Sequence, residues 1–216
     1  GVRFGADVTE AAIAFEQPEV KFELDENGKP ISVFIKERIE TMLMIEDFML
    51  LANKKVAEHI YTMNKAADKD AAFVYRVHDA PKPEKIEDLA IFLHALGYEF
   101  RSEGGLVEAT DINALLKEVE GKPEENLIKT ATIRSMAKAV YTTKNIGHYG
   151  LAFKFYTHFT SPIRRYPDLM VHRLLRRRLN HEAIKPTEHA HYEHLSIQSS
   201  EQEMKAVSAE RESIKF

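Results

Sequence analysis

Apolar and polar side chains alternate with a period of two near the N-terminus of the chain. Residues 20–24 follow this alternation, and residues 31–35 repeat it after a polar turn at residues 25–30. A period of two places alternate side chains of a strand on one face, and two such strands joined by a turn form a hairpin. Residues 11–36 are therefore predicted to form a small antiparallel hairpin with one buried face.

Further along the chain, the spacing of apolar residues changes to that of helices. Residues 38–66 carry apolar side chains on most sides, which is typical of a helix that its neighbours bury. Shorter helices are expected at 83–96, 111–119 and 123–140, where apolar residues recur every three or four positions, and a short strand is expected at 73–77. The fold class predicted from these elements is α+β, rich in helix, with a small sheet near the N-terminus.

The most distinctive segment is 156–168, which reads Tyr-Thr-His-Phe-Thr-Ser-Pro-Ile-Arg-Arg-Tyr-Pro-Asp. Ser161 followed by Pro162 predicts a helix start, because serine accepts a bond from a free amide and proline at the first helical position loses none. A helix is therefore expected from Pro162 to about Asn180, with Pro167 as the point at which it would kink.

Two arginines, Arg164 and Arg165, fall in the first turn of this predicted helix, where the positive end of the helix dipole disfavours a cation. Their placement is explained if an anion such as a phosphate lies between them, the free amides of the turn and the hydroxyls of Thr160 and Ser161. The alternative is that both arginines pair with carboxylates elsewhere in the fold. The sequence leaves these two explanations balanced.

Charge adds a local argument for nucleic-acid binding. The 216-residue chain has a formal net charge of −4 at pH 7, so a basic binding surface has to be a local patch. One stretch supplies six arginines and no lysine: Arg164, Arg165, Arg173, Arg176, Arg177 and Arg178. The planar fork of arginine suits phosphate oxygens. A solvated charged face is the alternative explanation for the last three.

Composition excludes several classes of site. The chain has no cysteine, which excludes disulfides, thiolate nucleophiles and cysteine-bound metals and is consistent with a reducing cytoplasm. No apolar run is long enough to span a bilayer, so no membrane association is expected. The spacing of His148, His158 and His172 matches no compact metal-ligand motif, and no metal site is predicted from them.

Several segments together resemble the catalytic (RNB) domain of the ribonuclease II / ribonuclease R family, and look closest to its ribonuclease R branch. They are, in family order, 44–53 (Met-Ile-Glu-Asp-Phe-Met-Leu-Leu-Ala-Asn), 75–79 (Tyr-Arg-Val-His-Asp), 147–152 (Gly-His-Tyr-Gly-Leu-Ala), 156–168 with 172–173 (His-Arg), and 209–215 (Ala-Glu-Arg-Glu-Ser-Ile-Lys). The Thr-Ser-Pro-Ile-Arg-Arg-Tyr-Pro-Asp run is the most specific of these motifs.

The resemblance implies an activity. Enzymes of this family hydrolyse single-stranded RNA processively from the 3′ end, release nucleoside 5′-monophosphates and use Mg²⁺. By resemblance, Arg164 steadies charge on the scissile phosphate, and Glu210 is the glutamate of the catalytic pocket.

The resemblance also implies RNA contacts. Glu46 matches the group that senses the ribose 2′-hydroxyl, a contact that distinguishes RNA from DNA. Phe15 resembles a phenylalanine that stacks on a base near the 3′ end. Thr160, Ser161 and Arg165 are expected to bind RNA beside Arg164.

One departure from the family pattern limits the expected activity. The metal site of the family is a cluster of aspartates upstream of the hairpin, and this sequence has no such cluster, so family ligands cannot assemble a two-metal site. The flanking OB-type RNA-binding domains are also absent. Residues 1–216 are therefore expected to be the C-terminal part of an RNB catalytic domain that is inactive, or nearly so, by itself.

Two other functions remain open. The first is a catalytically inactive RNA-binding module derived from the same family. The second is an unrelated helical interaction protein, which would require Arg164 to face a carboxylate.

Overall fold

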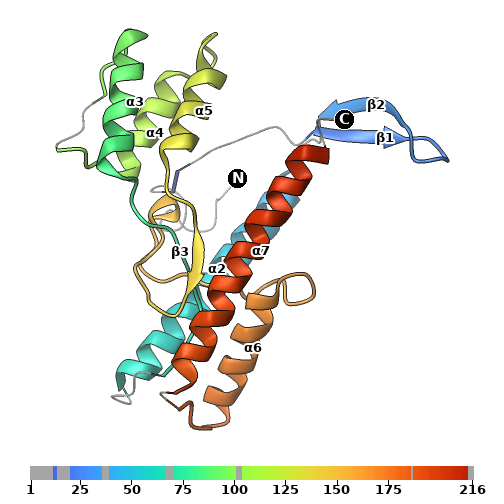
Figure 1. Ribbon diagram of the computed structural model, residues 1–216, viewed down its shortest axis with the longest axis vertical. Helices are drawn as coiled ribbons and strands as arrows, with labels where there is room; N and C mark the ends of the chain where they lie inside the picture. The colour runs from blue at the N-terminus through green and yellow to red at the C-terminus, as the bar shows by residue number, and fades with distance from the viewer. Residues whose placement is uncertain are drawn as a thin grey trace.

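A computed structural model describes residues 12–13, 20–35, 39–66, 71–100, 104–185 and 187–213. Its elements are, in chain order, β1 (Val20–Leu24), β2 (Pro30–Ile35), α2 (Glu40–Ala66), β3 (Tyr75–Val77), α3 (Pro83–Ala95), α4 (Ala109–Glu118), α5 (Glu125–Ser135), β4 (Val140–Thr142), the 3₁₀ turn η1 (Tyr149–Leu151), α6 (Tyr166–Leu179) and α7 (Glu188–Ser213) (Figure 1). Two small antiparallel sheets, β1–β2 and β3–β4, accompany the helices, and the predicted helix-rich α+β class is confirmed.

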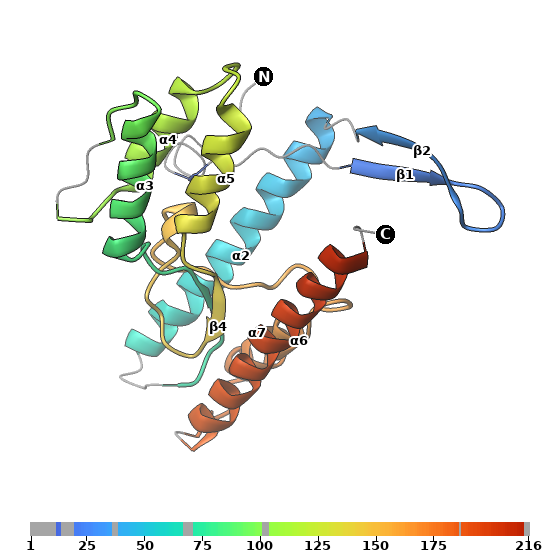
Figure 2. The same ribbon diagram turned by 45° about the horizontal axis from the view of Figure 1, so that its top comes forward.

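The predicted hairpin forms, but its predicted burial is wrong. β1 and β2 pair antiparallel, with Phe22 opposite Val33. Both side chains are nevertheless exposed, at 47% and 62%, because the hairpin projects from the body as a two-stranded ribbon and no described element covers either face (Figures 1 and 2). An alternating pattern predicts which face of a strand a packing partner would bury. Among the described residues, no element packs against this face of the hairpin.

The long helix α2 is confirmed, but only its C-terminal half is buried as predicted. Ala57 and Ile60 are 0% and 1% exposed, whereas Ile45 and Phe48 in the N-terminal half are 52% and 49% exposed. Since only the C-terminal half joins the main core, the apolar surface of the first turns stays in contact with solvent.

The main core gathers around β3. It contains residues from the C-terminal half of α2, from β3 and the residues before it, from β4, and from α6 and the segment after it. These residues are Ala57, Ile60, Ala71, Ala72, Phe73, Val74, Tyr75, Val77, Tyr141, Met170, Val171, Leu174 and Ile184. α7 packs along β4 and against α6. This core fixes the position of α6 and of the segment that precedes it.

A second body consists of α3, α4 and α5, with two apolar clusters of its own. Pro83 occupies the first turn of α3, as predicted, and Gly97 follows the helix at φ 85°, a conformation that glycine adopts without strain. α4 begins with a capping box in which Glu108 is the N-cap and Asp111 is the third helical residue.

The helix predicted at 123–140 is shorter than expected and is followed by a strand that the sequence did not predict. α5 is Glu125–Ser135, and β4 begins at Val140. β4 pairs antiparallel with β3, placing Arg76 opposite Tyr141. Three residues are too few for a period of two to be recognised, so the pairing with β3 decides the conformation of β4. Within the described ranges, no helix is both long and apolar enough to cross a bilayer.

Candidate functional site

Residues 156–160, here called the anchor segment, run beside β3 and lead to the arginines. The backbone amide of Arg76 donates to the carbonyl of Tyr156 at 3.0 Å. The hydroxyl of Thr157 donates to the carbonyl of Val74 at 2.7 Å, and Thr157 is buried. These bonds attach the start of the anchor segment to the main core.

Two further elements hold the end of the anchor segment. From α2, the side-chain oxygen of Asn53 accepts from the amides of Phe159 and Thr160 at 2.9 and 3.2 Å. From α6, His172 Nε2 shares a 2.8 Å hydrogen bond with the carbonyl of Phe159, and the two rings stack with their centroids 4.1 Å apart. The backbone of the segment is therefore fixed on three sides before the arginines begin.

The arginines lie in a turn, residues 161–165, and not in a helix as predicted. The amides of Arg164 and Arg165 donate to the carbonyl of Ser161 at 3.3 and 3.0 Å, and α6 begins only at Tyr166, with Arg165 as N-cap. Pro167 falls in the first turn of α6, where the missing amide removes no helical bond, so the expected kink is absent there. These residues, 161–165, are called the arginine turn, and they connect the anchor segment to α6.

A buried carboxylate organises the arginine turn. Asp168 is 0% exposed, and its Oδ1 accepts from the amide of Ser161 at 2.7 Å and from the guanidinium of Arg165 at 2.8 Å. An acid in the first helical turn also complements the helix dipole. Asp168 therefore performs the N-terminal stabilisation that the sequence assigned to Ser161.

The two explanations for the arginine pair apply to different residues. Arg165 pairs with Asp168, which agrees with the structural alternative. Arg164 is exposed, and no side-chain hydrogen bond or ion pair engages it in the part of the chain that the structure describes. The backbone amides of Thr160 and Ser161 are not available to an anion, since they donate to Asn53 and Asp168. Among the described residues, the guanidinium of Arg164 and the hydroxyls of Thr160 and Ser161 have no hydrogen-bond partner and are available to an anion.

The basic patch downstream is smaller than its sequence suggests. Arg177 donates to Glu188 at 2.8 Å and to the carbonyl of Ala183 at 2.7 Å. Arg178 donates to the side-chain oxygen of Asn64. Both are half-buried structural residues, whereas Arg173 and Arg176 are exposed on α6.

The remaining predicted site residues are dispersed. Glu46 is half-buried in the N-terminal half of α2, Glu210 is exposed near the end of α7, and Phe15 lies outside the described residues. The N-terminal end of α2 and the C-terminal end of α7 lie toward the same end of the molecule, beside the hairpin (Figures 1 and 2). Between described residues, no hydrogen bond or ion pair joins Glu210 to the arginine turn.

Known proteins resemble the chain over nearly its whole length. The sequence matches the family described as "RNB domain" over residues 7–181. The chain belongs to the RNB domain family. Ribonuclease R of Aquifex aeolicus (strain VF5) is 39% identical over 206 residues, which are 95% of this chain and 28% of that protein.

Two solved structures are similar to this RNB chain. One is Mycoplasma genitalium RNase R in complex with ribose methylated single-stranded RNA, at 29% identity and a TM-score of 0.81, covering 94% of this chain and 31% of that one. The other is yeast Ssd1, described as a pseudonuclease, at 26% identity and a TM-score of 0.60, covering 77% of this chain and 20% of that one. The RNB chain thus spans less than a third of the length of each relative named here.

α7 is attached to the sheet of the RNB chain by an ion pair that the sequence did not reveal. Arg76 on β3 donates to both carboxylate oxygens of Glu203 at 2.6 and 3.2 Å, and its guanidinium lies 4.5 Å from the ring centroid of Tyr141. Bidentate geometry and a stacked ring make arginine hard to replace by lysine here. No spacing rule could have paired residues 127 positions apart.

A row of aromatic rings lies beside the anchor segment. His148 and Tyr156 are 5.3 Å apart by their ring centroids, and Tyr156 and His158 are 5.8 Å apart. His158 Nδ1 shares a 2.7 Å hydrogen bond with the hydroxyl of Tyr141. Burial, assisted by the positive charge of Arg165, lowers the pKa of His158 to about 2. Burial also lowers the pKa of His148 to about 3, so both rings are neutral at pH 7.

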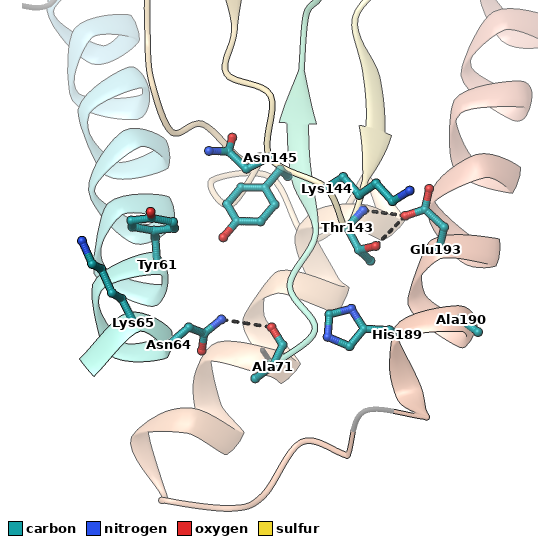
Figure 3. Close-up of a pocket in the computed structure, with 11 residues that line it drawn as sticks. Tyr61, Asn64, Lys65, Ala71, Thr143, Lys144, Asn145, His189, Ala190 and Glu193 are labelled. Atoms are coloured by element: carbon teal, nitrogen blue, oxygen red, sulfur yellow. Dashed lines mark hydrogen bonds between the residues drawn. The ribbon is translucent and has the colours of Figure 1, made fainter. Parts of the chain in front are cut away.

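A cavity of about 810 Å³ lies between the C-terminal end of α2, the β3–β4 sheet and the start of α7 (Figure 3). Among the described residues of its lining, Glu193 is the one acid, and it accepts from Thr142 and Thr143. The lining begins at Tyr61, which is about 22 Å along α2 from Glu46 at the usual helical rise. None of the predicted site residues lines it.

Magnesium does not fit the described residues of the RNB chain. No group of three or more His, Asp or Glu among them could hold a metal ion. Asp168, the acid nearest the arginines, already accepts from Ser161 and Arg165.

Two half-buried histidines, His148 and His158, predict how stability depends on pH. The pKa of an unfolded histidine is about 6.5, and the pKa values of His158 and His148 in the folded protein are lower. The unfolded state therefore binds more protons than the folded state when the pH falls below about 6.5. The free energy of unfolding should then fall by up to about 1.4 kcal/mol per pH unit for each histidine. Urea titrations at several pH values between about 7 and about 4.5 measure this slope.

Replacing one histidine isolates its share. The variant His158→Gln can keep a hydrogen bond to Tyr141. It should reduce the slope of the unfolding free energy against pH by the share of one histidine, which is about one bound proton. The variant His59→Gln, at an exposed position of α2, should give the parent profile. An unchanged slope in His158→Gln would show that this ring is not held neutral.

Proposed function

We propose that this chain is part of a 3′-to-5′ exoribonuclease that hydrolyses single-stranded RNA to nucleoside 5′-monophosphates. Its share of the active site is the phosphate-binding arginine, Arg164. The observation that carries the proposal is the contrast between two adjacent arginines, of which Arg165 is bound to Asp168 and Arg164 is exposed. Membership of the RNB family and the RNA in one related structure support the choice of ligand.

The chemistry of Arg164 follows from its position. A guanidinium presents planar pairs of donors that match phosphate oxygens, and a fixed positive charge stabilises the charge that develops during phosphoryl transfer. Thr160 and Ser161 precede Arg164 by four and three residues, and their hydroxyls would act as further donors to a phosphate. Arg165 acts differently, because its pairing with Asp168 shapes the turn.

Glu46 and Glu210 complete the proposal. Glu46, on α2, would contact a ribose 2′-hydroxyl, which distinguishes RNA from DNA. Glu210, on α7, would lie in the catalytic pocket once RNA and the metal-bearing part of the enzyme are in place. Mg²⁺ dependence belongs to the complete enzyme, since the described residues offer no ligand group for it.

An inactive RNA-binding module is the second candidate. The lack of a metal-ligand group among the described residues and the similarity to a protein described as a pseudonuclease favour it. Both candidates require Arg164 to bind phosphate. They differ in whether the rest of the protein contributes a metal site.

Replacing Arg164 tests the shared part of both candidates. The variant Arg164→Ala should weaken binding of a single-stranded RNA oligomer by about 1–3 kcal/mol, the usual range for a charge-assisted hydrogen bond, and Arg164→Lys should fall between it and the parent. The slope of log affinity against log salt should decrease by about 0.7, as for one lost phosphate contact. Fluorescence anisotropy at several salt concentrations measures both quantities.

A charge-matched variant supplies the control. Arg134 is exposed on α5, so Arg134→Ala removes the same charge from another part of the surface. If this variant weakened RNA binding as much as Arg164→Ala, the effect would come from net charge, and the assignment of Arg164 would be wrong.

Hydrolysis distinguishes a free-standing nuclease from the proposed part of one. A 5′-labelled single-stranded RNA incubated with this chain and Mg²⁺ should remain intact, because the described residues hold no metal-ligand group. Parallel reactions with EDTA control for contaminating nucleases. Stepwise shortening that EDTA stops and that Arg164→Ala abolishes would show that the chain assembles its own metal site.

A further inference from the structure

One buried side chain on α2 makes three hydrogen bonds to the anchor segment. Asn53 is 4% exposed, and its Oδ1 accepts from the amides of Phe159 and Thr160 at 2.9 and 3.2 Å. Its Nδ2 donates to the hydroxyl of Tyr156 at 3.2 Å. The partners are 103 to 107 positions away in sequence, so this amide joins two distant parts of the chain.

These bonds determine both the orientation of the amide and the place of the backbone. Two consecutive backbone donors face Oδ1, which fixes the side-chain oxygen toward the anchor segment and the nitrogen toward Tyr156. If the backbone at Phe159 and Thr160 shifted, two part-buried amides would lose their acceptor. The segment therefore keeps one position relative to α2.

The same face of α2 carries Glu46. Residues seven apart in a helix lie on one face, two turns along the axis, so Glu46 and Asn53 face the same side of α2. The arginine turn begins directly after Thr160, the last residue that Asn53 holds. One rigid helix thus connects the acid assigned to the ribose with the backbone that presents Arg164.

We propose that Asn53 is a positioning residue that sets the place of Arg164 relative to Glu46 and thereby makes phosphate binding by Arg164 effective. This inference rests on the proposed function for its ligand, RNA. Asn53 touches no substrate itself and acts through the amides of Phe159 and Thr160. Loss of these two bonds should therefore weaken RNA binding only to the extent that Arg164 contributes to it.

Variants can separate the bonds. In Asn53→Leu, a side chain of similar shape replaces the amide and removes all three hydrogen bonds. If this variant does not fold, Asn53→Ser serves instead, because its side chain is too short to reach the three partners. Asn53→Asp keeps two acceptor oxygens for the amides. Tyr156→Phe removes only the bond from Nδ2, so it is the control for a general loss of buried hydrogen bonding.

A double-mutant cycle on RNA affinity tests the proposal with this chain. Arg164→Ala should weaken binding of single-stranded RNA about tenfold in the parent and less than about twofold when Asn53→Leu is present. Tyr156→Phe should leave the effect of Arg164→Ala near its parent value. Equal effects of Arg164→Ala with and without Asn53→Leu would overturn the proposal, because a merely structural asparagine predicts additivity.

Hydrogen exchange supplies a readout that does not depend on RNA. The amides of Phe159 and Thr160 should exchange faster in Asn53→Leu, and keep their protection in Asn53→Asp and Tyr156→Phe. Unchanged protection in Asn53→Leu would contradict the positioning role. If Arg164→Ala did not affect RNA affinity in the parent, the proposed function would fail, while the exchange result would still decide whether Asn53 holds the turn.

Discussion

The buried carboxylate of Asp168 decides what the two neighbouring arginines can do. It neutralises Arg165 and accepts the amide of Ser161, so one short stretch of chain contains a structural arginine and an exposed one. Its other oxygen, Oδ2, and Arg165 Nε are buried without a hydrogen-bond partner among the described residues. A buried ion pair of this kind is costly to break, since either partner alone would be an uncompensated charge. The turn that presents Arg164 is therefore held by strong, local electrostatics.

The rest of the fold supplies a frame for that turn. The main core places β3, α2 and α6 around the anchor segment, and each contributes hydrogen bonds to it. The ion pair between Arg76 on β3 and Glu203 attaches α7 to the β3–β4 sheet. The rings of His148 and His158 lie beside the segment and are neutral at pH 7, so they add no positive charge there. Because the backbone that carries Arg164 is already fixed, binding of a phosphate would have to order only the side chain.

Much of the fold could be predicted from periodicity alone. The hairpin, α2 and α3 follow from their apolar spacing, because local periodicity is imposed by the geometry of strands and helices. Burial could not be predicted in the same way. The exposed apolar residues of the hairpin and of early α2 show that a pattern states which face seeks a partner, whereas the presence of that partner is a tertiary property.

The site was predictable only in part, for a similar reason. Arg164 and Arg165 stood out because the helix dipole disfavours cations in the first turn of the predicted helix, but the sequence could not say which of them was paired. The spacing of Arg165 and Asp168 was a usable signal, since residues three apart are neighbours at a helix start. Asn53 and the pair between Arg76 and Glu203 had no such signal. The role of a polar residue on an apolar helix face depends on the distant segment that packs against it, and the sequence does not show which segment this is.

The central claim is that Arg164 engages RNA phosphate while Arg165 stays on Asp168. The most direct measurement follows the guanidinium Nε–H resonances of the two arginines by NMR as single-stranded RNA is added, with Arg164→Lys and Arg165→Lys used for assignment. We expect the Arg164 signal to shift with RNA concentration and the Arg165 signal to stay unchanged. A shift of the Arg165 signal with an unchanged Arg164 signal would contradict it.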